Sequence, residues 1–139
     1  MVDPFTDLKT ACHALAKNCG PALAWSWDGR FGAALATFPA TQAAAVLAAV
    51  STVLPLRWDL GTIGQAASAV QAKVQAIGGL RDGQFVLATP ADQDVLLVAA
   101  WWPWGGGQTI SIRVFPVPAG LFLVDHDALV AAFRSGLAV

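Results

Sequence analysis

Apolar residues near the start of the chain recur at spacings of three and four, which is the period of an α-helix. The stripe consists of Phe5, Leu8, Cys12, Leu15 and Cys19. Asp3 and Pro4 suit the N-cap and first turn of such a helix, and Gly20-Pro21 suits its end. The pattern predicts a first helix with one buried face.

A hairpin is predicted next, because Asp28-Gly29 is a strong signal for a two-residue type I′ turn. Its strands span 22–27 and 30–38. This turn would place Trp27 opposite Arg30, with the guanidinium near enough to cover an indole ring. Trp25 and Trp27 would then share one face of the sheet.

The middle of the chain predicts one or two helices. Residues 41–53 carry no charge and include Val46 and Val50 among many alanines. A helix that is apolar on all sides is buried or lies in an interface. A second apolar stripe ends at Gly78-Gly79, and Thr62 with Gln65 forms a candidate capping box at its start.

The second half of the chain reads as a three-strand meander followed by a helix. The strands cover 85–88, 95–102 and 109–117, and residues 121–124 lead into a final helix that Asp125 or Asp127 can cap. In the last strand Ile110, Ile112 and Val114 point one way, and Thr109, Ser111 and Arg113 point the other.

The expected fold is therefore a single α+β domain over residues 1–139. An antiparallel sheet of about five strands, a hairpin plus a meander, would pack with three to four helices in the order α-β-β-α-α-β-β-β-α. This order is similar to that of roadblock-like and profilin-like domains and of type III secretion chaperones. The similarity is one of element order alone, so no family is assigned.

Composition narrows the possible partners. The chain is 56% hydrophobic and 12% charged, its net charge is −1, and all nine acidic residues are Asp. The eight Lys and Arg residues are scattered, so no basic stripe for nucleic acid is formed. So little charge cannot coat every helix, which indicates that another protein, a second copy or a larger assembly, covers some faces. The alternative is an Ala-rich composition bias with no covering partner.

Two features bear on location. The uncharged stretch 31–56 is long enough to span a bilayer of about 30 Å. Pro39 and several polar residues within it favour a strand followed by an interior helix, so no membrane span is expected. The acidic N-terminus is unlike a signal peptide, and a cytoplasmic location is expected.

The six tryptophans are the main candidates for binding, because Trp combines a large apolar area with an N–H donor. Trp104 is the ring expected to be exposed, since it stands beside Gly105-Gly106-Gly107. The candidate binding or interface residues are Trp25, Trp27, Arg30, Trp102, Trp104, Val46 and Val50.

No pattern points to catalysis, a metal or a cofactor. The three glycines lack the Lys and Ser/Thr of a phosphate loop. Cys12 and Cys19 would lie about 10 Å apart along a helix, too far to share an ion or a disulfide. Asp125-His126-Asp127 is more simply explained as a helix cap than as part of a triad.

We therefore expect a non-catalytic protein-interaction module, a homo-oligomer (dimer) or a small chaperone-like subunit of an assembly. It would associate through the uncharged helix and the Trp-bearing turns. The first alternative is a protein with a Trp-lined pocket for a small apolar molecule, and the second is an enzyme of unknown class.

Overall fold

The computed structural model describes residues 3–120 and 124–139, which form four α-helices and one antiparallel sheet of six strands. The helices are α1 Thr6–Cys19, α2 Ala43–Val53, α3 Ser68–Ala76 and α4 His126–Leu137. The strands are β1 Ser26–Asp28, β2 Ala33–Pro39, β3 Leu56–Asp59, β4 Phe85–Ala88, β5 Val95–Trp104 and β6 Thr109–Pro118. The strand order is β1-β2-β6-β5-β4-β3. The predicted α+β class is confirmed.

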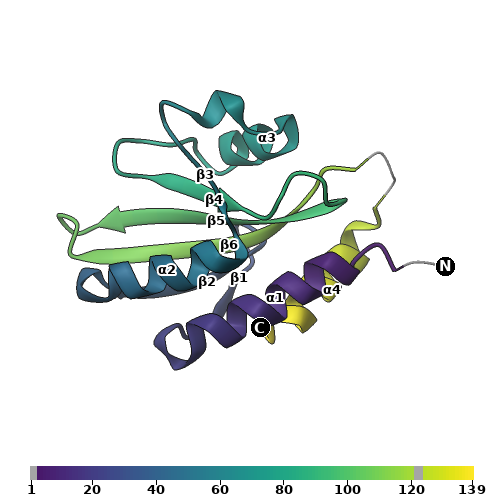
Figure 1. The fold of residues 1–139 in the computed structure, drawn as a ribbon, viewed down its shortest axis with the longest axis horizontal. Coiled ribbons are helices and arrows are strands. Elements are labelled where there is room, and N and C mark those ends of the chain that lie inside the picture. Colours follow the sequence, from purple (N-terminus) through teal and green to yellow (C-terminus); the bar gives the residue numbers. More distant parts are fainter. Residues whose placement is uncertain (1–2, 121–123) are drawn as a thin grey trace.

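The helices are divided unequally between the two faces of the sheet. Helices α1, α2 and α4 cover one face, and α3 lies on the other (Figure 1). Because β5 lies under helices on both sides, its residues 95–101 are all buried, which explains their continuous apolar run.

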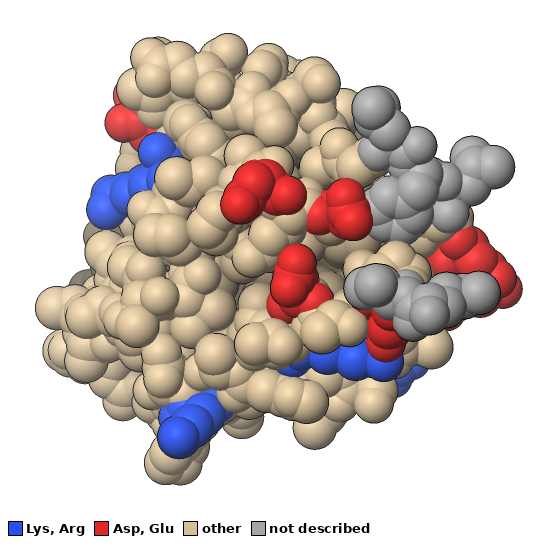
Figure 2. Space-filling model, turned by 45° about the vertical axis from the view of Figure 1, so that its right-hand side comes forward, with Lys and Arg blue, Asp and Glu red and all other residues tan. Residues whose placement is uncertain are grey.

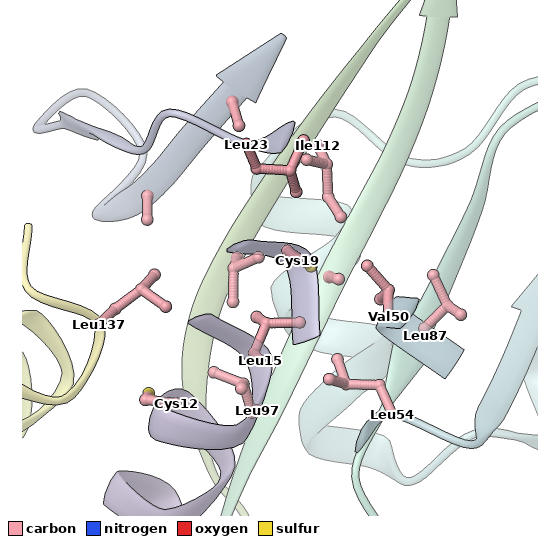
Figure 3. Packing of buried hydrophobic residues seen from close by; sticks show 14 of the residues in the cluster. Cys12, Leu15, Cys19, Leu23, Val50, Leu54, Leu87, Leu97, Ile112 and Leu137 are labelled. Carbon is pink, nitrogen blue, oxygen red and sulfur yellow. The ribbon is translucent and has the colours of Figure 1, made fainter. Parts of the chain in front are cut away.

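The larger core lies beneath α1, α2 and α4. Leu15 of α1, Leu97 of β5 and Ile112 of β6 meet there with Val50 and Leu137 (Figure 3). These side chains are almost completely buried, and each contributes about 1.5–3 kcal/mol by leaving water. The predicted stripe of the first helix is confirmed, since its last four members are buried.

The smaller core lies beneath α3, where Val70 and Val74 pack against Val98 and Phe115. Helix α3 has only nine residues, so it is about 14 Å long and covers only part of this face. On the α3 side, no helix of the described residues lies over the corner of the sheet next to the β5–β6 turn, at the left of Figure 1.

The β1–β2 hairpin differs from the prediction. Trp27 pairs with Ala34, not with Arg30, so the loop holds four residues instead of two. The Asp28 carbonyl accepts the Phe31 N–H and the Asp28 carboxylate accepts the Arg30 N–H. The positive φ falls on Gly32, at 61°, and not on Gly29. A longer turn, stabilised by the Asp28 side chain, replaces the type I′ turn.

In the middle of the chain one strand was not predicted and one predicted helix start was wrong. Residues 56–59 form an unexpected sixth strand, which pairs with β4 at the edge of the sheet. The predicted capping box at Thr62 is absent, because the Thr62 hydroxyl accepts the backbone N–H of Asp59. The helix begins six residues later, at Ser68.

The start of α4 was predicted correctly. The Asp125 carboxylate accepts the backbone N–H groups of Asp127 at 3.0 Å and Ala128 at 3.4 Å. Most of the predicted lead-in, residues 121–123, lies outside the described residues. Within the described residues no helix has the length and apolar character needed to cross a membrane.

Candidate functional site

The structure separates the predicted binding residues onto the two faces of the sheet. Trp25 and Trp27 lie on the side of the three helices, partly buried against the larger core. The Trp27 ring is 6.3 Å from the ring of Phe133, and the guanidinium of Arg134 lies 4.5 Å from its centre. Arg134 therefore takes the place over the indole that was predicted for Arg30.

Val46 and Val50 lie inside the chain's own core, with 4% and 0% of their surface exposed. Figure 3 shows Val50 close to Leu87 of the sheet. The expected use of these two valines in an interface is therefore corrected, since a partner cannot reach them. The outward positions of α2 include Ala44, Ala45 and Ala48.

The remaining predicted residues meet at the open corner of the sheet. Trp102 and Trp104, at the end of β5, and Arg30, in the β1–β2 loop, line a pocket of about 550 Å³. We call it the arginine–tryptophan pocket. Its full lining is Arg30, Phe31, Ile77, Gly78, Gly79, Arg81, Gln84, Trp102, Pro103, Trp104, Ser111 and Arg113.

Three of the chain's eight cationic residues line this pocket: Arg30, Arg81 and Arg113. They come from three separate segments, namely the β1–β2 loop, the loop after α3, and β6. Among the described residues that line the pocket there is no carboxylate. Guanidinium groups bind carboxylates and phosphates with paired hydrogen bonds, so the lining suits an anion.

One carboxylate, that of Asp28, organises two of these arginines from outside the lining. It accepts a hydrogen bond from Arg113 Nε at 3.2 Å and another from the Arg30 backbone N–H at 3.2 Å. Arg113 and Asp28 are both mostly buried, with side-chain exposures of 25% and 16%. Asp28 therefore ties the loop that carries Arg30 to the strand that carries Arg113.

The Trp104 indole is exposed but held in place. Half of the residue's surface, 53%, is accessible, which confirms the expected exposure. Its Nε1 donates to the Ser111 hydroxyl at 2.8 Å, and that hydroxyl is also 3.2 Å from the Thr37 hydroxyl. These contacts fix the ring at the rim of the pocket and leave most of it accessible to a ligand.

Acidic residues gather at the other end of the long strands. Asp92 and Asp94 lie in the β4–β5 loop, and Asp125 and Asp127 lie where β6 leads into α4. On the face seen in Figure 2, acidic side chains are grouped across the middle and right, and most of the surface carries no charge. The positive pocket and these four aspartates therefore occupy opposite ends of β5 and β6.

The two cysteines, which the sequence offered as metal-binding candidates, are both buried. Burial raises the pKa of the Cys12 thiol to about 12 and that of Cys19 to about 11, so both thiols are protonated at neutral pH. Asp125 caps α4. Within residues 3–120 and 124–139, no three His, Cys, Asp or Glu side chains are grouped so that they could hold an ion.

Arg81, Arg113, Ser111 and Phe31 are pocket residues that the sequence did not identify. The alternation of residues 109–117 predicted which side chains of β6 share one face of the sheet. However, nothing local indicates that β6 pairs with β2, which brings the β1–β2 loop beside Arg113. The pocket is a product of strand order, and strand order is not encoded in any short segment.

No protein-family model, no curated protein and no solved structure matches this chain. Its function is therefore inferred from the pocket.

Proposed function

We propose that this protein is a non-catalytic binding module, and that the arginine–tryptophan pocket binds an anionic group of its ligand. The observation that carries the proposal is the convergence of Arg30, Arg81 and Arg113 with Trp102 and Trp104 in one helix-free corner. A volume of about 550 Å³ is typical of ligand sites, which usually range over about 300–1,000 Å³.

Binding rather than chemistry is supported by the protonation behaviour of the lining. Arginine stays charged at all accessible pH values, and none of the other described lining residues exchanges a proton near neutral pH. The Ser111 hydroxyl contacts the Trp104 indole and the Thr37 hydroxyl, and neither is a base that could activate it.

A titration of intrinsic tryptophan fluorescence tests the proposal. Benzoate and phenyl phosphate should give saturable changes, whereas benzylamine, a cation of similar size, should give none. Arg81→Gln should weaken binding of both anions about tenfold or more, because a charge-assisted hydrogen bond is lost. Arg57→Gln is the matched control, since Arg57 lies over the Phe85 ring outside the pocket. Equal binding of benzylamine would refute the proposal.

A second candidate function is self-association through the outer side of α2. The observation that favours it is the exposure of Ala44, Ala45 and Ala48 on a helix without any charged residue. A dimer seen by light scattering, and dissociated by Ala45→Lys, would support this candidate. A monomer at high concentration would exclude it.

A further inference from the structure

The charges around the arginine–tryptophan pocket do not balance. Arg30, Arg81 and Arg113 carry three positive charges, and Asp28, paired with Arg113, supplies one negative charge. Among the described residues, the other two arginines of the lining, Arg30 and Arg81, have no carboxylate in an ion pair with them. A ligand group with two negative charges would neutralise them, whereas a single carboxylate would leave one uncompensated.

The hydrogen bonds of Arg113 leave its paired donors available. Among the described residues, its only side-chain hydrogen bond runs from Nε to Asp28. The two terminal Nη groups therefore keep donors that can engage two oxygens of one anion. Since Asp28 also binds the Arg30 backbone N–H, the cationic side of the pocket is organised before the ligand arrives.

The other side of the pocket is flat and aromatic. Trp102 is half-buried in the lining, and Trp104 is fixed at the rim by its bond to Ser111. The Phe31 ring is less available, because the guanidiniums of Arg30 and Arg113 lie 4.9 and 5.1 Å from its centre. An indole face of this kind stacks on planar rings without requiring a particular hydrogen-bond pattern.

We propose that the ligand group is a phosphate monoester carried on a planar ring. This inference rests on the proposed anion-binding function and specifies its ligand. A phosphate monoester has a charge of about −1.5 to −2 at neutral pH and three acceptor oxygens, which match the charge excess and the donors. A phosphorylated tyrosine side chain presents this chemistry directly, and a nucleotide presents the same phosphate monoester and planar ring separated by a ribose.

The test compares four probes by fluorescence titration at fixed ionic strength. Phenyl phosphate should bind about tenfold or more tightly than phenyl sulfate, which has the same shape and one negative charge. It should also bind about tenfold more tightly than inorganic phosphate, which lacks the ring, and more tightly than benzoate. Adenosine monophosphate and a phosphotyrosine amide are then titrated. The probe that binds more tightly shows whether the phosphate belongs to a nucleotide or to a phosphorylated tyrosine.

The outcomes separate this inference from the proposed function. If phenyl sulfate and benzoate bind as tightly as phenyl phosphate, the phosphate inference is overturned and the anion-binding function stands. If no anion binds, both are overturned. If inorganic phosphate binds as tightly as phenyl phosphate, the pocket does not recognise the ring, and that part of the inference is overturned.

Two variants locate the binding within the pocket. Arg113→Lys keeps the charge but removes the paired donors, so it should weaken the binding of phenyl phosphate and phenyl sulfate alike. Trp104→Leu should weaken phenyl phosphate and leave inorganic phosphate unchanged. Arg57→Gln serves again as the control, and circular dichroism confirms that each variant is folded. Unchanged affinity for both esters in Arg113→Lys would contradict the role given to Arg113.

Discussion

Helices α1 and α4 approach each other closely at Gly136, and this contact allows a stability prediction in which two effects oppose each other. A Cβ atom added at Gly136 would lie 2.9 Å from the Cβ of Cys12 and 3.5 Å from the α-carbon of Lys9. Neither atom is the end of a flexible side chain. Since carbon atoms pack best at about 3.5–4.0 Å, Gly136→Ala must push the helices apart.

The sign of the expected stability change follows from comparing the helix-propensity gain with the packing cost. Replacing glycine by alanine within a helix gains at most about 1 kcal/mol of helix propensity. Overpacking a tight contact typically costs about 1–3 kcal/mol, and Cys12 is fully buried, so it has no room to yield. The middle of this cost range less the propensity gain is about 1 kcal/mol, so we expect Gly136→Ala to lower the free energy of unfolding by about 1 kcal/mol and the Tm by roughly 3–5 °C.

Gly64 provides the matched control. Its φ is not in the left-handed region, and an added Cβ would meet no atom within 4 Å. Gly64→Ala should therefore leave stability unchanged or raise it by about 0.4–1 kcal/mol. Both variants are compared with the parent chain by urea denaturation, followed by tryptophan fluorescence. A Gly136→Ala variant as stable as the parent would refute the reasoning about the helix contact.

Four other predictions follow from single contacts. Asp125→Ala should lower stability by about 1 kcal/mol in urea denaturation, because the cap of α4 is lost; an unchanged midpoint would contradict the cap. As pH rises above about 9, the thiols of the unfolded chain should ionise first, since burial raises the pKa of Cys12 to about 12 and of Cys19 to about 11. The free energy of unfolding should therefore be constant below that pH and fall above it, by at most about 1.4 kcal/mol per thiol and pH unit. A variant with both cysteines replaced by alanine should show a shallower fall. Trp104→Ala should keep the fold, judged by circular dichroism, because that ring is half exposed. Arg81→Gln should change the unliganded stability by less than about 0.5 kcal/mol in the same denaturation assay, because Arg81 is exposed, and a larger loss would mark it as structural.

The sequence predicted those elements whose signals are local. The stripe of α1, the bounds of β4 and the cap of α4 each depend on neighbouring residues, and all three were correct. Strand β3 was missed because its four residues lie between a proline and a turn, too few to show an alternation. Thr62 and Gln65 have the spacing of a capping box. However, the Asp59 carboxylate accepts both the hydroxyl and the backbone N–H of Thr62, which a capping box would use.

The candidate site was less predictable, for a different reason. Trp104 was identified because it stands beside three glycines, but the predicted strand ended at Trp102, so the continuation of β5 to Trp104 was missed. Trp25 and Trp27 are also two residues apart, yet they pack against the core on the opposite side of the sheet and are half-buried there. Residue type therefore identified candidates, but the positions of the helices decided which tryptophans stay accessible.

The contacts of the Lys and Arg residues outside the arginine–tryptophan pocket support a binding role for the pocket. Four of them have partners elsewhere in the fold: Lys9 pairs with Asp3, Arg57 lies over Phe85, Lys73 over Phe115 and Arg134 over Trp27. In a chain so poor in charge, each of these side chains covers an aromatic ring or pairs with an acid. Arg30, Arg81 and Arg113 line one cavity, in which, among the described residues, Arg113 alone has an ion pair, with Asp28. Such a grouping of like charges carries a repulsive cost, which the ion pair of Arg113 with Asp28 offsets only in part. An anionic ligand removes the same cost when it binds, which is why the imbalance supports a binding role.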